Sequence, residues 1–149
     1  DLNGLINTYQ SNSTSSSNNL SDKQYWLYAP GSNASKWDEF YNEGVMAIGW
    51  NDLSDLSQYS SKAEIGTVLI EALNRTSVTN DALCCYDFSN TIKIGDIIIA
   101  KKGRKEYLGY GIVDGDYYYD ESAADFKHRR KVNWINKKIK KRLKIFLFK

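Results

Sequence analysis

Apolar and polar residues alternate along this chain in short blocks, and the period of each block predicts an element. Residues 24–29, QYWLYA, alternate between two faces as a strand does, and Pro30-Gly31 ends that strand. Residues 34–42 then place aromatic side chains on one face of a helix, with Ser32 or Asn33 as its cap. The first block therefore predicts a strand followed by a short helix.

The next apolar blocks predict one more strand and two more helices. Residues 45–48 read as a short buried strand that leaves through Gly49-Trp50. Ser61 and Glu64 have the spacing of a capping box ahead of an amphipathic helix. We expect another helix over residues 81–88.

The second half of the chain predicts a hairpin and further strands. Residues 97–100 are a continuous apolar run typical of a central strand, 102–104 form a turn, and 107–113 return as its partner. Residues 117–119 and 130–135 are the remaining strand candidates. Helices inserted early among hairpin-spaced strands favour an α+β fold, with a curved mixed β-sheet or barrel and flanking helices.

The chain has room for one domain of ordinary size, because it has 149 residues and domains most often have about 100–150. Residues 1–22 contain a Ser- and Asn-rich stretch that buries too little surface to order itself, so we expect a flexible N-terminal linker. The first residue is Asp, which favours a piece of a longer protein. We place the folded domain at residues 23–135 and a basic tail at residues 136–149.

Charge is distributed unevenly along the chain. Residues 1–126 carry 9 Lys and Arg against 18 Asp and Glu, whereas residues 127–149 carry 11 Lys and Arg and no acid. The tail has two interpretations: a segment that binds nucleic acid or a membrane surface, or an aberrant end from a truncation or a shifted reading frame. The sequence leaves both open.

Several classes of function lack their signatures. No apolar run approaches the roughly 18 residues that cross a bilayer, and no signal segment opens the chain, so we expect a cytoplasmic protein. The adjacent Cys84 and Cys85 suit neither a disulfide nor a metal site. The single histidine, His128, lies in a basic run and is expected to be exposed to solvent. With no phosphate-binding loop and no catalytic constellation, we predict a binding domain without enzymatic activity, metal or cofactor.

Four segments together resemble a known family. They are QYWLYAPGSNASKWDEFYNEGVMAIGWNDLSDLSQY at 24–59, IKIGDIIIAKKGRKEYLGYGIV at 92–113, DYYYDE at 116–121 and HRRKVNWI at 128–135. In this order they resemble the EVE-like domain that accompanies the AAA+ subunit of McrB-type modification-dependent restriction systems. The resemblance ends after residue 135, where family members usually continue with a Trp/Glu-Leu-Pro segment.

The resemblance implies a PUA/EVE-like fold of the PUA and YTH superfamily, whose members bind RNA or DNA. It further implies a reader that flips one modified base out of the double helix into an aromatic cage. By position, the polar loop of such a reader would be residues 31–33, its cage tryptophan Trp50, its hairpin residues 97–113, and its late strand the one with Trp134. Tyr117, Tyr118 or Tyr119 would supply a second wall.

Physical chemistry suggests roles for the residues around that cage. Stacking of a base on Trp50 is worth roughly 1–3 kcal/mol, although a tryptophan at a strand end can equally belong to the core. The other three tryptophans step with apolar neighbours and are expected in the core. Polar groups for the base edge are offered by Ser32, Asn33, Asn51 and Asp52, and phosphate contacts by Lys101, Lys102, Arg104 and Lys105.

We therefore expect a specificity module that reads a modified base in double-stranded DNA. The resemblance implies a downstream AAA+ GTPase domain and a nuclease subunit as partners, and no membrane partner. Two alternatives remain: an RNA-binding regulatory module of the PUA kind, distinguished by the ribose 2′-OH, and a protein-interaction domain that uses its aromatic surface.

Overall fold

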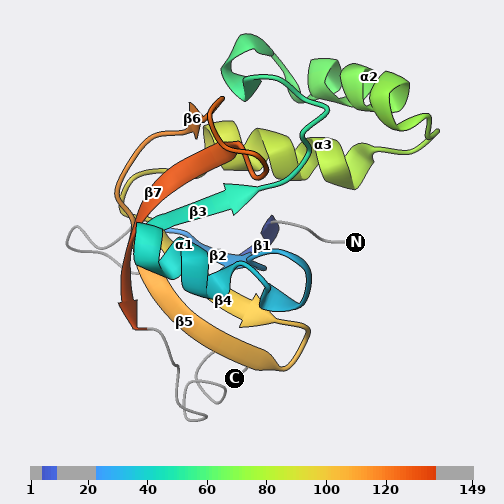
Figure 1. Ribbon diagram of the computed structural model, residues 1–149. Coiled ribbons are helices and arrows are strands. Elements are labelled where there is room, and N and C mark those ends of the chain that lie inside the picture. The colour runs from blue at the N-terminus through green and yellow to red at the C-terminus, as the bar shows by residue number, and fades with distance from the viewer. Residues whose placement is uncertain (1–4, 10–22, 137–149) are drawn as a thin grey trace, which may run out of the picture.

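A strongly curled mixed sheet with three helices forms the protein, as Figure 1 shows for the computed structural model. The structure describes residues 5–9 and 23–136, and the predicted basic tail lies outside this range except for Asn136. The strand order is β1-β2-β4-β5-β7-β3, with β6 paired to β7. The strands are β1 (Leu5–Tyr9), β2 (Tyr25–Tyr28), β3 (Val45–Ile48), β4 (Ile97–Lys102), β5 (Glu106–Val113), β6 (Tyr118–Tyr119) and β7 (His128–Asn136). The predicted α+β fold with a curved sheet is confirmed.

The helices lie in two places. Helix α1 (Trp37–Glu43) occupies the opening of the curled sheet, whereas α2 (Lys62–Leu73) and α3 (Thr79–Tyr86) pack on each other beyond the end of β3 (Figure 1). Short 3-10 turns precede α1 (η1, Ser32–Ala34) and α2 (η2, Leu56–Gln58), and a π-helical turn (η3, Asp87–Thr91) extends α3. The chain segment between β3 and α2 therefore connects the sheet to the helical pair.

Two predictions about the N-terminal part differ from the structure. Within the predicted linker, Leu5–Tyr9 forms strand β1, antiparallel to β2, so the linker prediction does not apply to these residues. Helix α1 begins at Trp37, three residues later than predicted, because Asn33 and Ala34 have left-handed backbones with φ of 52° and 57°. Its cap residue is Lys36, which makes no side-chain capping bond, so capping by Ser32 or Asn33 is wrong.

The capping box of α2 is present. Ser61 Oγ accepts a hydrogen bond of 3.1 Å from the backbone N–H of Glu64, as predicted. The Glu64 carboxylate in turn accepts a hydrogen bond of 2.7 Å from the backbone N–H of Ser60. The bond from Glu64 satisfies an N–H group that the first helical turn leaves without an intrahelical partner, and the bond from Ser60 ties the residue before the cap to the helix.

Three of the four tryptophans belong to the core, as predicted. Trp26, Trp37 and Trp134 are 1%, 7% and 9% exposed. The Trp26 indole N–H donates to the Asp96 carboxylate at 2.9 Å, which also accepts the backbone N–H of Lys93 at 3.0 Å. Asp96 thus joins β2 to the turn that precedes its parallel neighbour β4.

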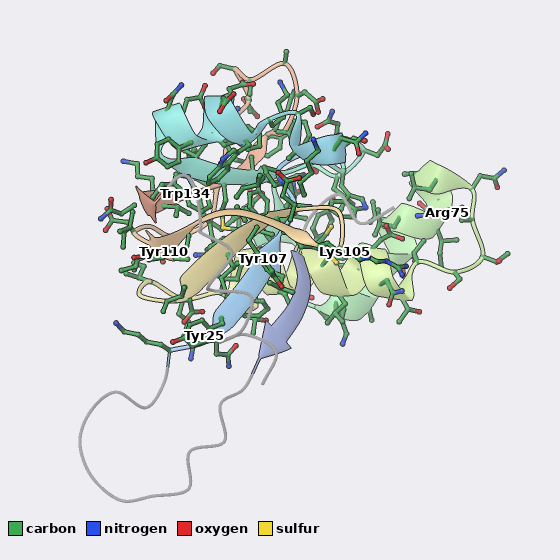
Figure 2. All side chains as sticks on the ribbon, turned by 90° about the horizontal axis from the view of Figure 1, so that it is seen from below. Tyr25, Arg75, Lys105, Tyr107, Tyr110 and Trp134 are labelled. Carbon is green, nitrogen blue, oxygen red and sulfur yellow. The ribbon has the colours of Figure 1, made fainter. Side chains whose placement is uncertain are left out.

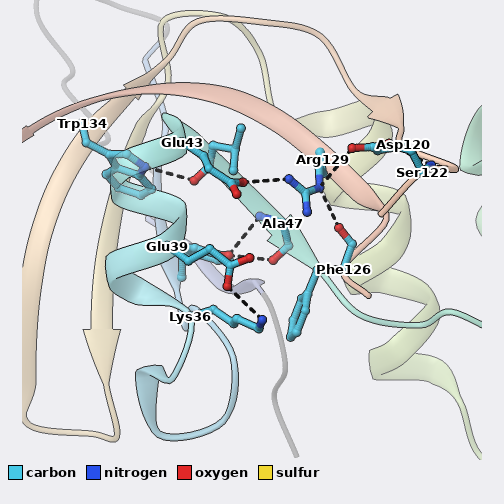
Figure 3. Close-up of polar contacts among 11 residues, drawn as sticks. Lys36, Glu39, Glu43, Ala47, Asp120, Ser122, Phe126, Arg129 and Trp134 are labelled. Atoms are coloured by element: carbon cyan, nitrogen blue, oxygen red, sulfur yellow. Dashed lines mark hydrogen bonds and ion pairs between the residues drawn. The ribbon is translucent and has the colours of Figure 1, made fainter. Parts of the chain in front are cut away.

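Strand β7 holds the two halves of the sheet together. Gly111 of β5 lies so close to it that an added Cβ would stand 2.6 Å from Val132 and 2.7 Å from Trp134. The Trp134 indole donates to the Val45 carbonyl of β3 at 3.0 Å. Arg129 of β7 contacts Glu43 at the end of α1 at 2.9 Å (Figure 3). These contacts fix the direction in which β3 leaves the sheet, and with it the position of Trp50.

Candidate functional site: a cavity beside Trp50

Trp50 lines a cavity of about 960 Å³ between the end of β3 and the corner where α2 meets α3. The indole is half-buried, so it belongs neither to the core nor fully to the surface. Asn51 and Asp52 line the cavity on the same side as Trp50. The α2–α3 corner contributes Arg75, Asn80 and Asp81 on the other. The cavity thus combines one large aromatic ring with several polar side chains.

Asp81 fixes the indole of Trp50 in place. Its Oδ1 accepts a hydrogen bond of 3.2 Å from the Trp50 indole N–H, and its Oδ2 pairs with Arg75 at 2.8 Å. Asp81 stands in the first turn of α3, where the helix dipole favours a negative charge. Both oxygens are engaged, so the ring edge and the arginine are held by a single carboxylate.

A chain of hydrogen bonds that does not involve Asp81 ends on the backbone carbonyl of Trp50. Trp50 has a left-handed φ of 56°, which is uncommon for a bulky residue. His128 Nε2 donates to the Trp50 carbonyl at 3.1 Å, and Tyr117 donates its hydroxyl hydrogen to His128 Nδ1 at 2.8 Å. The Tyr117 oxygen in turn accepts the backbone N–H of Leu56 at 2.9 Å. We name this chain the Tyr117–His128 relay.

The hydrogen-bond partners of His128 indicate which ring nitrogen carries the hydrogen, and its burial indicates its charge state. A carbonyl can only accept, so Nε2 carries the hydrogen and Nδ1 accepts from Tyr117. Burial lowers the pKa of His128, against the opposing effect of its hydrogen bond to Trp50. Burial also raises the pKa of Tyr117. His128 is therefore a neutral buried residue with 0% exposure, and the prediction that it is exposed to solvent is wrong.

One further contact joins the cavity rim to the loop before β7. The Asn51 side chain donates to the Asp125 carboxylate at 2.7 Å. The residue after Asp125, Phe126, has a left-handed φ of 51° and packs its ring against Phe40 of α1. The loop that carries Asn51 is thereby connected to the opening of the sheet.

Comparison with known proteins gives one match. The family model of a domain of unknown function (DUF8426) matches residues 26–148. The chain belongs to this family. No curated protein and no solved structure matches it. The matched region of this DUF8426 chain runs from β2 past the end of β7 into the basic segment.

The structure brings together only part of the predicted base-binding set. Trp50, Asn51 and Asp52 line one cavity, whereas Ser32 and Asn33 lie in η1 and do not line it. Tyr117, Tyr118 and Tyr119 do not line it either: the Tyr117 hydroxyl bonds to His128, and the other two form β6. The second aromatic wall predicted from one of these three tyrosines is therefore absent from this cavity.

The predicted phosphate-binding residues lie far from the cavity. Lys101, Lys102, Arg104 and Lys105 belong to the β4–β5 hairpin, at the opposite end of the molecule from α2 and α3 (Figure 1). Figure 2 looks along the direction of this separation from below, with Lys105 on the hairpin and Arg75 at the helical corner both labelled. One nucleotide cannot contact both places.

Sequence reasoning missed the wall of the cavity that the helical corner contributes. Arg75, Asn80 and Asp81 lie in the polar stretch RTSVTND, which follows α2 and runs into the first turn of α3 and which by composition reads as an ordinary loop. The signal was the acid at the start of a helix, a position that often serves only the helix itself.

In the parts of the chain that the structure describes, no helix is long and apolar enough to cross a membrane. Within residues 5–9 and 23–136, no three His, Cys, Asp or Glu side chains gather where they could hold a metal ion.

Proposed function

We propose that this DUF8426 chain is a DNA-reading module that receives a modified base, flipped out of the double helix, in the cavity beside Trp50. The observation that carries the proposal is the combination of a half-buried indole with polar side chains from two separate segments around one cavity. Stacking of a base on an aromatic side chain stabilises a complex by roughly 1–3 kcal/mol. Extruding a base costs a few kcal/mol, so stacking must be joined by contacts to the base edge.

The indole is held firmly enough to act as a stacking surface. The carboxylate of Asp81 holds its edge, and the Tyr117–His128 relay holds its backbone. A ring fixed in advance loses little conformational entropy when a ligand binds, so more of the stacking energy appears as affinity. The two supports act on different parts of Trp50, one on the indole N–H and one on the backbone carbonyl, so both the ring and its backbone are held.

The charges of the cavity suit a base edge better than a phosphate. Arg75 and Asp81 pair with each other, and Asp52 adds an exposed carboxylate. Carboxylate and amide oxygens accept hydrogen bonds from the amino and imino groups of a base. A phosphate in the same place would face the Asp52 charge without a free cation on the described wall.

The size of the cavity leaves room for a substituent on the base. Sites for small ligands measure about 300–1,000 Å³, and this cavity lies near the upper limit. Leu73 provides an apolar wall at the end of α2. A methyl group buried against such a wall contributes about 0.8 kcal/mol, a modest preference for a modified base.

The biological setting that we propose follows the resemblance to EVE-like domains. In that setting the chain supplies specificity for modified double-stranded DNA, and a downstream AAA+ GTPase domain and a nuclease subunit supply motor and cleavage. The curled sheet with flanking helices supports this assignment, since it agrees with the fold that the resemblance implies. Fold alone does not determine function, and the weight of the proposal rests on the cavity.

Binding of the full chain to labelled duplexes, measured by fluorescence anisotropy, tests the proposal. The duplexes carry unmodified bases, N6-methyladenine, 5-methylcytosine or 5-hydroxymethylcytosine, and an RNA duplex of the same sequence is included. We expect one modified DNA to bind best, and Trp50→Ala to reduce that affinity by about 5- to 150-fold, the equivalent of roughly 1–3 kcal/mol of stacking.

Tyr25→Ala is the matched control, because Tyr25 is an aromatic residue on β2 with 36% exposure that does not line the cavity. It should leave the preference unchanged. Equal binding to every duplex, unaffected by Trp50→Ala, would exclude the base cavity. Preference for RNA that depends on Trp50 would replace the DNA reader by the RNA-binding alternative.

A further inference from the structure

A second cavity, of about 600 Å³, lies on the other side of the Tyr117–His128 relay and plays no part in the proposed base site. Its wall includes Tyr117, Ser57 of η2, Asn90 of η3, Lys93 and Arg130 of β7. The first cavity is lined by two acids and one cation, Asp52, Asp81 and Arg75, whereas this one is lined by two cations and one acid, Lys93, Arg130 and Asp116. The difference in charge points to a different kind of ligand.

Arg130 is a buried cation that uses only three of its five guanidinium N–H groups in hydrogen bonds within the described residues. Only 3% of its surface is exposed, yet it lines the cavity. Its Nε, Nη1 and Nη2 donate to the carbonyls of Phe88, Gly115 and Ser89 at 2.6, 3.1 and 3.2 Å. A guanidinium has five N–H groups, so one on Nη1 and one on Nη2 have no acceptor among the described residues.

The positive charge of Arg130 also lacks a direct counter-ion. No carboxylate of the described residues forms an ion pair with it, and its three acceptors are neutral carbonyls. Burial lowers the pKa of Arg130, while Asp116 and Asp96 raise it from a greater distance. A buried charge without a close partner is costly, and an anion in the cavity would offset that cost.

Lys93 adds a second positive charge at the same place. Its side chain is exposed, lines the cavity and takes part in no ion pair among the residues that the structure describes. Asp116, also exposed, is the carboxylate on the described wall and opposes an anion. The wall therefore carries two cations against one acid.

We propose that this cavity is an anion site that binds a phosphate group between the spare guanidinium N–H groups of Arg130 and the ammonium group of Lys93. Arginine presents paired N–H groups that match two phosphate oxygens, and lysine acts as a mobile point charge. The phosphate can come from free phosphate or from a nucleic acid strand, and the two sources share this chemistry.

NMR on the full chain tests the site with inorganic phosphate as the probe. Phosphate is titrated at constant ionic strength against chloride while the Arg130 Nε–H and the amides of Ser89 and Asn90 are followed. We expect saturable shifts at these groups. Absence of a saturable shift up to about 50 mM phosphate, which corresponds to a Kd weaker than about 10⁻² M, overturns the proposal.

Lys93 and Asp116 are exposed residues of opposite charge on the cavity wall, so neutralising each one should change phosphate affinity in the opposite direction. Lys93→Gln should weaken phosphate binding about two- to fivefold, and Asp116→Asn should strengthen it by a similar factor, as expected for exposed charges. Both residues are on the surface, so the fold does not depend on them, unlike Arg130, which holds three carbonyls. Equal affinity in the wild type and both variants would also overturn the proposal.

A second titration, with a short single-stranded oligodeoxythymidine, identifies the source of the phosphate. Stronger binding of the oligonucleotide than of phosphate at the same groups assigns the site to a nucleic acid strand, and weaker binding assigns it to free phosphate. The inference is independent of the base cavity, because Trp50→Ala should leave the phosphate shifts at Arg130 unchanged.

Discussion

Replacing Tyr117 by Phe removes one hydroxyl and breaks two hydrogen bonds of the relay. The hydroxyl accepts the N–H of Leu56 and donates to His128 Nδ1, and both of these residues are 0% exposed. A buried polar group left without a partner costs about 1–3 kcal/mol. Two such groups predict a loss of about 2–6 kcal/mol in the free energy of unfolding, a large part of the roughly 5–15 kcal/mol of an ordinary domain.

The neighbouring Tyr118 provides the matched control. It is the next residue in the chain and the first of β6, it is 36% exposed, and its hydroxyl makes no hydrogen bond within the described residues. Tyr118→Phe should therefore change stability by less than about 0.5 kcal/mol. Urea unfolding followed by tryptophan fluorescence measures both variants. If the two lose the same stability, the relay does not carry the energy that we assign to it. If only Tyr117→Phe is destabilised, its affinity for the preferred duplex should fall too, because the backbone of Trp50 is released.

Three further predictions concern the pH dependence, the sheet and a helix cap. Burial lowers the pKa of His128, the single histidine of the chain, so below its ordinary pKa of about 6.5 the unfolded state binds a proton that the folded state does not. The free energy of unfolding should therefore fall by up to about 1.4 kcal/mol per pH unit as the pH drops below that value, and His128→Asn should remove this slope in urea titrations between pH 5 and 7. Gly111→Ala should destabilise the fold by about 3 kcal/mol or more, since its Cβ would collide with Trp134, whereas Gly49→Ala meets open space and should be nearly neutral in the same urea assay. Ser61→Ala should cost about 1 kcal/mol in thermal unfolding because α2 loses its cap, and an unchanged melting temperature would contradict the capping geometry.

The sequence alone determined the elements whose cause is local. Alternation predicts β2, the apolar run predicts β4, and the turn at Gly103 joins β4 to β5, because a strand shows its buried face directly in its pattern. The capping box at Ser61 predicts the start of α2 for the same reason, since its bonds connect residues close in the chain. Trp26, Trp37 and Trp134 could be placed in the core from their apolar spacing.

The start of α1 and the existence of β1 could not be predicted from the local sequence pattern. The left-handed backbones of Asn33 and Ala34 delay the helix although their side chains permit a cap. Strand β1 is a strand because β2 offers it an edge for pairing, and the polar sequence after it does not signal that edge.

Only the tertiary structure decided which polar residues meet. Trp50, Asn51 and Asp52 follow one another in the chain, so any fold keeps them together, but the α2–α3 corner that completes the cavity is remote in sequence. His128 reads as an exposed member of a basic run, yet the pairing of β7 with β3 and β6 turns it inward to Trp50 and Tyr117. Composition and period report the average environment of a residue, whereas long-range hydrogen bonds and charge pairs arise only when the sheet has curled and closed around them.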